Sequence, residues 1–174
     1  MEKQHPSRLR FNFGFLLEGS LGVSRTIEIN YPKIKVASDL TLKPLQGIFT
    51  ATRTGEGIYL SGQLQSFLDI NCVRCLDDSK LAVLLKIDDL YYYPPSAAPE
   101  GEYFLGDDGY IDLAPLVREL AVLEMPIQPI CKSDCLGLCV ICGQNLNEGQ
   151  CNCKQDSIDP RLAPLKELLD SRPG

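Results

Sequence analysis

The pattern that decides the fold is an alternation of apolar and polar side chains, clearest in Ile58-Tyr59-Leu60-Ser61-Gly62-Gln63-Leu64. A period of two residues places successive side chains on opposite faces of a strand, so that one face can be buried while the other meets water. The same alternation recurs in residues 26–30 and 33–36. We therefore expect about six strands between Phe11 and Tyr93, arranged as an antiparallel β unit.

Turn residues separate these apolar runs. Gly55-Glu56-Gly57 lies between two of them and predicts a hairpin loop. Tyr91-Tyr92-Tyr93 stands before two prolines and predicts the end of the last strand, and residues 96–102 follow as a loop that contains proline, glycine and acids. Strand-end aromatics pack on their own sheet more often than they stack on bases, so we assign no RNA contact to these tyrosines.

A helical period begins after Gly109. Asp112 can cap a helix over residues 113–124, and Pro126 ends it. This helix carries one apolar stripe suited to packing on the sheet, formed by Leu113, Leu116, Val117, Leu120 and Leu123. A second helix is expected from Asp159 to about Ser171, because Asp159 suits the N-cap and the following proline suits the first turn.

These elements predict an α+β fold, with an antiparallel sheet or partly open barrel, one packed helix, a cysteine-rich zinc knuckle and a short C-terminal helix. We expect a β-rich domain over residues 1–130, with its helix at about 112–124, and a zinc-knuckle tail over residues 131–174. No apolar stretch reaches the ~20 residues that cross a bilayer, and neither a signal nor a transit peptide is recognisable. We expect a soluble, cytoplasmic protein with no membrane partner.

The net charge of −6 is unevenly distributed. Residues 1–75 carry nine Lys and Arg against six Asp and Glu, whereas residues 76–174 carry eight against seventeen. An acidic chain does not attract phosphate through its overall charge, so non-specific electrostatics are a poor explanation of what this protein binds.

All eight cysteines stand in close pairs, which are Cys72 and Cys75, Cys131 and Cys135, Cys139 and Cys142, and Cys151 and Cys153. Disulfides are disfavoured in the reducing cytosol. A Cys-x-x-Cys turn instead brings both sulfurs to about 2.3 Å from a tetrahedral ion, and Gly143 permits the left-handed backbone that such a knuckle often needs. The pairs therefore predict structural metal sites.

A structural Zn²⁺ ion takes four ligands, so eight thiolates divide into two sites. The simplest partition forms a local site from Cys139, Cys142, Cys151 and Cys153, closed by the turn at residues 147–149. The second site then joins Cys72 and Cys75 of the β unit to Cys131 and Cys135 of the tail. The unusual spacers of two pairs leave open a mixed site in which Cys135 joins Cys139 and Cys142, and iron is an alternative to zinc.

Catalytic arrangements are not recognisable in the sequence. A catalytic zinc usually has histidine or carboxylate ligands and an open position, and the only histidine, His5, stands near the N-terminus. Thiol exchange usually asks for an exposed pair near a βαβ pattern, which this chain lacks. We expect neither an enzyme nor a small-molecule substrate.

Several segments resemble the YceD family, and these are Cys72–Leu76, Ile111–Leu113, Met125–Cys131, Cys135–Asn147, Cys151–Cys153 and Asp159–Arg161. The resemblance extends from about Gly47 to Leu169. This family is named for large ribosomal RNA subunit accumulation. The resemblance implies a non-catalytic role in the production or stability of that RNA, and hence in ribosome assembly, in the bacterial cytoplasm or in plastids.

The partners that the resemblance implies are a ribosome assembly intermediate, ribosomal RNA or a basic ribosomal protein. The acidic charge of the chain makes a basic protein at least as good a candidate as RNA. A second hypothesis is a zinc-ribbon adaptor for a protein complex unrelated to the ribosome.

Overall fold

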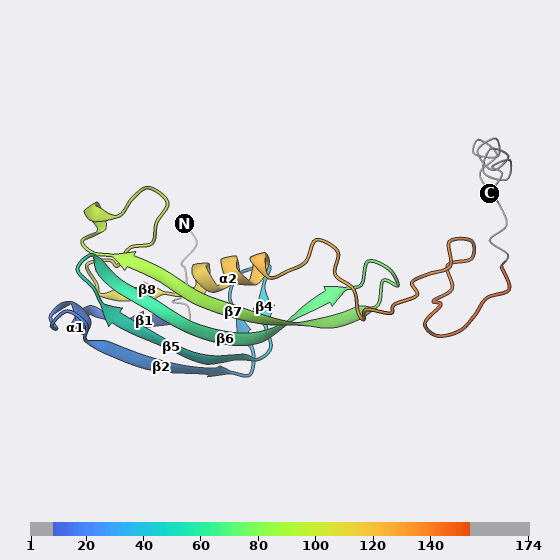
Figure 1. Ribbon diagram of the computed structural model, residues 1–174, viewed down its shortest axis with the longest axis horizontal. Coiled ribbons are helices and arrows are strands. Elements are labelled where there is room, and N and C mark those ends of the chain that lie inside the picture. The colour runs from blue at the N-terminus through green and yellow to red at the C-terminus, as the bar shows by residue number, and fades with distance from the viewer. Residues whose placement is uncertain (1–8, 154–174) are drawn as a thin grey trace, which may run out of the picture.

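The computed structural model describes residues 9–153. These residues form an elongated molecule, with a β body at one end and the cysteine-rich segment at the other (Figure 1). The C-terminal helix expected between Asp159 and Ser171 lies outside the described residues. No helix among residues 9–153 is long and apolar enough to cross a membrane.

The main sheet contains four antiparallel strands in the order β2-β5-β6-β7, namely β2 (Ser24–Tyr31), β5 (Leu45–Arg53), β6 (Gly57–Asn71) and β7 (Asp78–Tyr92). Burial alternates along β6 as the sequence pattern predicts, because Leu64 and Leu68 are buried while Gln63 and Gln65 are exposed. Strands β2 and β7 are edges that do not pair with each other, so the sheet is open. The expected antiparallel sheet is confirmed, as an open sheet and not a closed barrel.

Two further strand pairs flank this sheet. β1 (Arg10–Asn12) pairs with β8 (Tyr110–Asp112), and β3 (Ile34–Lys35) pairs with β4 (Thr41–Leu42). Seven strands, β1 to β7, therefore precede Tyr93, where the alternation predicted about six. The alternation at residues 33–36 corresponds to the two-residue strand β3, whereas the short strands β1 and β4 gave no periodic signal.

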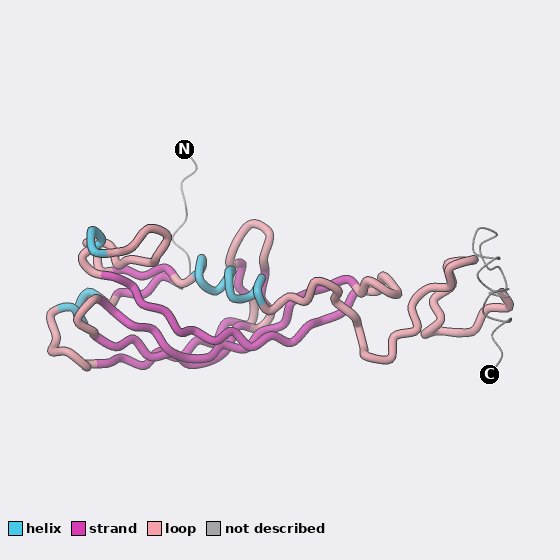
Figure 2. Tube along the Cα trace, turned by 45° about the horizontal axis from the view of Figure 1, so that its top comes forward, coloured by secondary structure: helices cyan, strands magenta, loops and turns pink. Residues whose placement is uncertain are grey.

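The strands β6 and β7 form a hairpin that is longer than the rest of the sheet. They pair without interruption from Gly57 with Tyr92 to Asn71 with Asp78. Strand β5 accompanies β6 only as far as Ser66. The last part of the hairpin is consequently a two-stranded ribbon that extends beyond the body toward the cysteine-rich segment (Figure 2).

The expected hairpin loop between β5 and β6 is present at residues 54–56, where the Thr54 N–H donates to Gly57 O over 2.9 Å. The expected strand end at the three tyrosines is also confirmed, because β7 ends at Tyr92. Tyr91 packs in the core and stacks on Tyr103 with ring centroids 5.1 Å apart. Its hydroxyl has no hydrogen-bond partner among the described residues.

Residues 9–153 also contain three short helical segments, namely α1 (Gly14–Leu17), the 3-10 turn η1 (Pro95–Ala97) and α2 (Ala114–Leu123). Asp112 Oδ1 accepts the Ala114 N–H over 2.9 Å, so the Asp112 side chain does bind a free backbone N–H in the first turn of α2. In Figure 1, α2 lies along the hairpin of β6 and β7, and it packs mainly against β7.

The predicted apolar stripe of α2 is wrong at Leu123, which is 73% exposed. The buried face is centred on Val117 and includes two alanines, Ala114 and Ala121. At 3.6 residues per turn, Leu123 stands about 120° around the helix from Val117, where it lines an open surface hollow beside β7 and is not covered by the core.

Candidate metal centres

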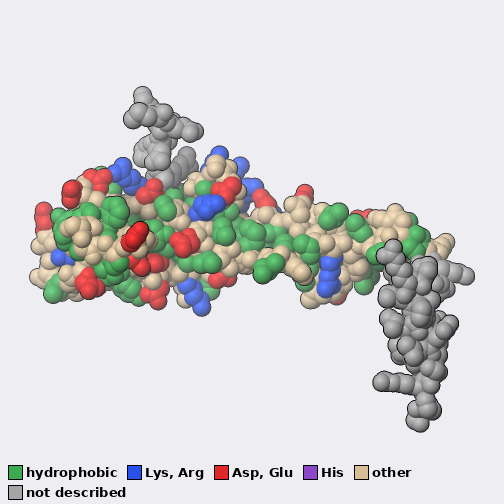
Figure 3. Space-filling model, turned by 90° about the horizontal axis from the view of Figure 1, so that it is seen from above, with side chains coloured by type: hydrophobic (Ala, Val, Ile, Leu, Met, Phe, Trp, Pro, Cys, Tyr) green, Lys and Arg blue, Asp and Glu red, His purple; other side chains and the backbone are tan. Residues whose placement is uncertain are grey.

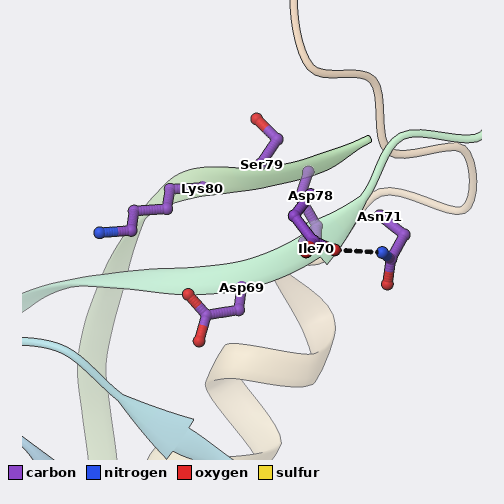
Figure 4. Close-up of a pocket in the computed structure, with 6 residues that line it drawn as sticks. All are labelled: Asp69, Ile70, Asn71, Asp78, Ser79 and Lys80. Carbon is purple, nitrogen blue, oxygen red and sulfur yellow. Dashed lines mark hydrogen bonds between the residues drawn. The ribbon is translucent and has the colours of Figure 1, made fainter. Parts of the chain in front are cut away.

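The long hairpin places the first cysteine pair at its tip. Figure 4 shows Asn71 and Asp78 facing each other where β6 ends and β7 begins, and Asn71 Nδ2 donates to Asp78 Oδ1 over 2.6 Å. Within the loop, the Cys72 N–H donates to Asp77 O over 2.9 Å, and the Leu76 N–H donates to Cys72 O over 2.9 Å. The turn thereby holds Cys72 and Cys75 at the end of the two-stranded ribbon.

The chain that follows α2 runs back against this tip. The Val73 N–H donates to Pro129 O over 2.9 Å, and Arg74 Nη1 donates to Cys135 O over 3.0 Å. These contacts bring two tail cysteines to the hairpin pair. We call the resulting set the first centre, and its members are Cys72, Cys75, Cys131 and Cys135.

The four sulfur atoms of the first centre all lie within 4.8 Å of one another. Cys72 Sγ is 3.8 Å from Cys135 Sγ, and Cys75 Sγ is 3.6 Å from Cys131 Sγ. A disulfide would need about 2.05 Å, whereas a tetrahedron with metal–sulfur bonds of about 2.3 Å has edges of about 3.8 Å. The first centre thus has the dimensions of a four-thiolate metal site.

The remaining cysteines gather within the last described segment. We call this set the second centre, and its members are Cys139, Cys142, Cys151 and Cys153, whose sulfur atoms also lie within 4.8 Å of one another. The Gly143 N–H donates to Cys139 O over 2.9 Å, and Gly143 has a φ of +75°, the left-handed conformation expected of this knuckle. A second peptide N–H, that of Ile141, donates to Cys139 Sγ over 3.5 Å.

Backbone amides make one thiol of each centre acidic. Burial raises the pKa of Cys72, but the peptide N–H groups of Cys75, Cys131 and Arg74 outweigh burial and bring the pKa to about 6. The N–H groups of Cys142 and Ile141 lower the pKa of Cys139 to about 6. These hydrogen bonds favour the thiolate, which is the form that binds metal.

Other thiols of the same centres shift in the opposite direction. Burial raises the pKa of Cys131, and the neighbouring thiol of Cys142 raises the pKa of Cys153 to about 12. Four thiolates packed this closely repel one another, so they cannot all ionise without a cation. A divalent metal ion would remove that penalty, and an all-sulfur tetrahedral donor set suits zinc or iron.

The structure therefore brings all eight predicted cysteines together, in the two sets that the spacing favoured. The mixed set, in which Cys135 would join Cys139 and Cys142, is not formed. That these cysteines ligate a metal stays a prediction, and the identity of the ion does too. His5, the only histidine, lies outside the described residues.

Sequence reasoning missed the polar contacts between the two centres. Asn147, which the sequence placed only in a turn, donates from Nδ2 to Cys135 Sγ over 3.4 Å. The Leu138 N–H also donates to Arg74 O over 3.1 Å. The spacing of the cysteines does not indicate which other side chains donate hydrogen bonds to their sulfur atoms. The asparagines that stand between the cysteine pairs were the only sequence feature that could have suggested such a contact.

Comparison with known proteins identifies a family that this chain matches. Residues 60–169 match the family described as large ribosomal RNA subunit accumulation protein YceD. An uncharacterized protein of Mycobacterium tuberculosis is 34% identical over 118 residues, which are 66% of this chain and 56% of that protein. No solved structure matches the chain significantly.

Two further relatives carry names of their own. The chloroplastic large ribosomal RNA subunit accumulation protein YCED homolog 1 of Arabidopsis thaliana is 41% identical over 157 residues, 73% of this chain and 49% of that protein. The uncharacterized protein YlbN of Bacillus subtilis is 25% identical over 138 residues, 78% of this chain and 74% of that protein. The chain spans about half the length of the mycobacterial and Arabidopsis relatives. Since the family match covers more than half of the chain and includes every cysteine of both centres, this chain belongs to the YceD family.

Proposed function

We propose that this protein is a zinc-binding, non-catalytic factor that supports the accumulation of large-subunit ribosomal RNA during ribosome biogenesis. The observation that carries the proposal is the coincidence of family and site, because both four-cysteine centres lie within the residues that match the YceD family. The ribosomal role itself rests on the family's name and on the names of the plant relatives.

Zinc is the ion that these centres suit best. Four thiolates complete a tetrahedral shell around Zn²⁺, and an ion without redox chemistry suits a structural role. Iron accepts the same donor set, so the metal must be identified by elemental analysis.

Two features support a non-catalytic role, namely the four-sulfur ligand sets and the hydrogen bonds made by the carboxylates beside the hairpin tip. Four sulfur ligands leave a tetrahedral ion no open position for substrate. A surface hollow of about 330 Å³ lies beside the hairpin tip (Figure 4), but its two carboxylates are engaged, Asp69 by Lys43 and Asp78 by Asn71. We therefore assign no reaction and no small-molecule substrate to the described residues.

The surface favours a basic ribosomal protein, or an assembly intermediate that contains one, over bare RNA. Acidic side chains gather on the face of the β body seen in Figure 3. The charged residues that line a hollow between β7 and α2 are four acids and one lysine, namely Asp88, Asp89, Glu102, Glu119 and Lys86. Such a surface repels phosphate and attracts cations, so contact through it is expected with Lys- and Arg-rich protein. We expect the protein to act where ribosomes assemble, in the cytoplasm of a bacterium.

The test combines metal analysis with depletion. The protein purified under reducing conditions should contain two zinc ions per chain. Depletion should lower large-subunit RNA relative to small-subunit RNA, and the intact protein should restore it.

Unchanged subunit profiles after depletion would reject the ribosomal role and favour the zinc-ribbon adaptor. Zinc-free protein with eight titratable thiols would reject the metal-binding half of the proposal. The two halves can therefore fail separately.

A further inference from the structure

The side chain of Asn147 lies between the two centres. In sequence it belongs to the second centre, because it stands in the loop that connects Cys142 to Cys151. In space its amide reaches the first centre, where Nδ2 lies 3.4 Å from Cys135 Sγ. A loop closed by one set of ligands thus presents a hydrogen-bond donor to a ligand of the other set.

Besides the contact with Cys135, two hydrogen bonds set the orientation of the Asn147 amide. Its Oδ1 accepts the Leu136 N–H over 3.0 Å, and its Nδ2 also donates to Asn145 Oδ1 over 2.9 Å. Reversing the amide would place its oxygen against a sulfur and another carbonyl oxygen, and would leave its nitrogen facing an N–H group. The donor therefore points at Cys135 Sγ and at no other sulfur.

Asn145 extends the connection to the hairpin tip. Its Nδ2 donates to Asp77 Oδ2 over 2.9 Å, and Asp77 O accepts the Cys72 N–H over 2.9 Å. Asn145 also forms an isolated antiparallel bridge with Leu138. The loop of the second centre is consequently bonded to both chain segments that carry ligands of the first.

The contact also matters electrostatically. Four thiolates around one divalent ion leave a net charge of −2, which N–H donors partly offset. Groups that hydrogen-bond a metal ligand typically change metal affinity by about 10–100-fold when they are removed.

We infer that Asn147 is a positioning residue that couples the two centres, so that an ion in the second centre holds the loop in place and thereby slows loss of the ion from the first. The inference rests on the proposed zinc binding. It makes the two centres a cooperative pair, in which emptying one weakens the other.

The experiment measures zinc release from the full-length protein, under reducing conditions, into an excess of a chromophoric chelator. The Cys75→Ser variant lacks the first centre and so identifies which kinetic phase belongs to it. In Asn147→Ala, that phase should be faster by roughly tenfold or more. Gln144→Ala is the matched control, because Gln144 Nε2 donates to Gly149 O within the same loop and reaches no sulfur, so its first-centre phase should equal that of the parent.

A double-mutant cycle tests the coupling itself. Cys142→Ser should empty the second centre and also speed release from the first. If both changes act through the same contact, Asn147→Ala adds no further acceleration in the Cys142→Ser background. Release from the first centre at the parent rate in Asn147→Ala, or multiplied effects in the double variant, would overturn the inference.

A second variant guards against simple misfolding. Asn147→Asp keeps the shape of the side chain but presents an oxygen to the thiolate, so its first-centre phase should be at least as fast as that of Asn147→Ala. Both variants should hold two zinc ions before the chelator is added. Zinc-free parent protein would reject the proposed zinc binding, whereas zinc-loaded variants with parent kinetics would reject only the role of Asn147.

Discussion

The β body and the metal end are stabilised by different means. Twenty-five buried residues form one continuous apolar core in the body, whereas the buried cluster around the first centre consists of three cysteines, with Ile130, Cys131 and Leu138 against it. Beyond α2 the described chain forms no helix or strand, and apolar side chains such as Val140, 83% exposed, remain in solvent. So small a segment cannot bury enough apolar surface to fold alone, and this difference explains why its sequence carries paired thiols instead.

Metal removal should have the largest effect, because it should unfold the metal end and leave the β body folded. A structural Zn²⁺ ion contributes about 10–16 kcal/mol of apparent binding free energy at neutral pH, and the metal end has little else to hold it. Chelation under reducing conditions should therefore unfold residues 131–153, while the sheet stays folded. Hydrogen exchange of the backbone amides measures this, with Phe49 and Leu64 as reporters of the core. Loss of protection at these two positions after chelation would mean that the regions fold as one.

Single ligand substitutions should show which centre joins the regions. Cys75→Ser removes a ligand of the first centre, which joins the hairpin to the tail. It should lower the free energy of unfolding by more than about 4 kcal/mol, the range expected for loss of a structural metal. Cys142→Ser should release one ion and loosen the tail, but leave the β body cooperatively folded. Thermal unfolding and zinc content of both variants decide the matter. Equal destabilisation, or release of both ions from either variant at saturating zinc, contradicts this division of roles.

A substitution in the apolar core tests whether the metal centres depend on the packing of the β body. Leu64 is fully buried in β6, so Leu64→Ala should lower the free energy of unfolding of the body by about 2–5 kcal/mol. Gln65→Ala, on the exposed face of the same strand, is the matched control and should change it by less than about 0.5 kcal/mol. Both variants should keep two zinc ions per chain in metal analysis. A core variant that loses zinc would show that the first centre depends on core packing.

The smallest effect is expected at Tyr91. Its ring is buried in the body, but its hydroxyl finds no hydrogen-bond partner among the described residues. Tyr91→Phe removes a buried polar group without opening a cavity, so it should leave stability unchanged or raise it by up to about 1 kcal/mol. Chemical denaturation measures the change, and Tyr103→Phe is the control, because the Tyr103 hydroxyl donates to Glu119 Oε2 over 2.7 Å. A clear loss of stability in Tyr91→Phe would point to a hydrogen bond that the described residues do not supply.

The elements that were predictable are those with a local cause. The alternation at residues 58–64 marked β6, the glycines around Glu56 marked its hairpin loop, and the helical period after Gly109 located α2 to within a residue at each end. Leu123 shows the limit of such patterns. An apolar residue at helical spacing is buried only where the helix has a surface to cover, and on α2 the small residues Ala114 and Ala121 are buried while Leu123 is exposed.

By itself, the sequence determined that this protein is largely β, that its cysteines come in pairs suited to four-ligand sites, and which family it resembles. Those properties follow from side-chain period and ligand spacing, which act over a few residues. Only the tertiary structure decided that Cys135 lies with Cys72 and not with Cys139, and that Asn147 reaches across from one centre to the other. Both outcomes depend on where the long hairpin of β6 and β7 ends, because its tip meets the chain returning from α2, and no local pattern encodes a distance between segments about 60 residues apart.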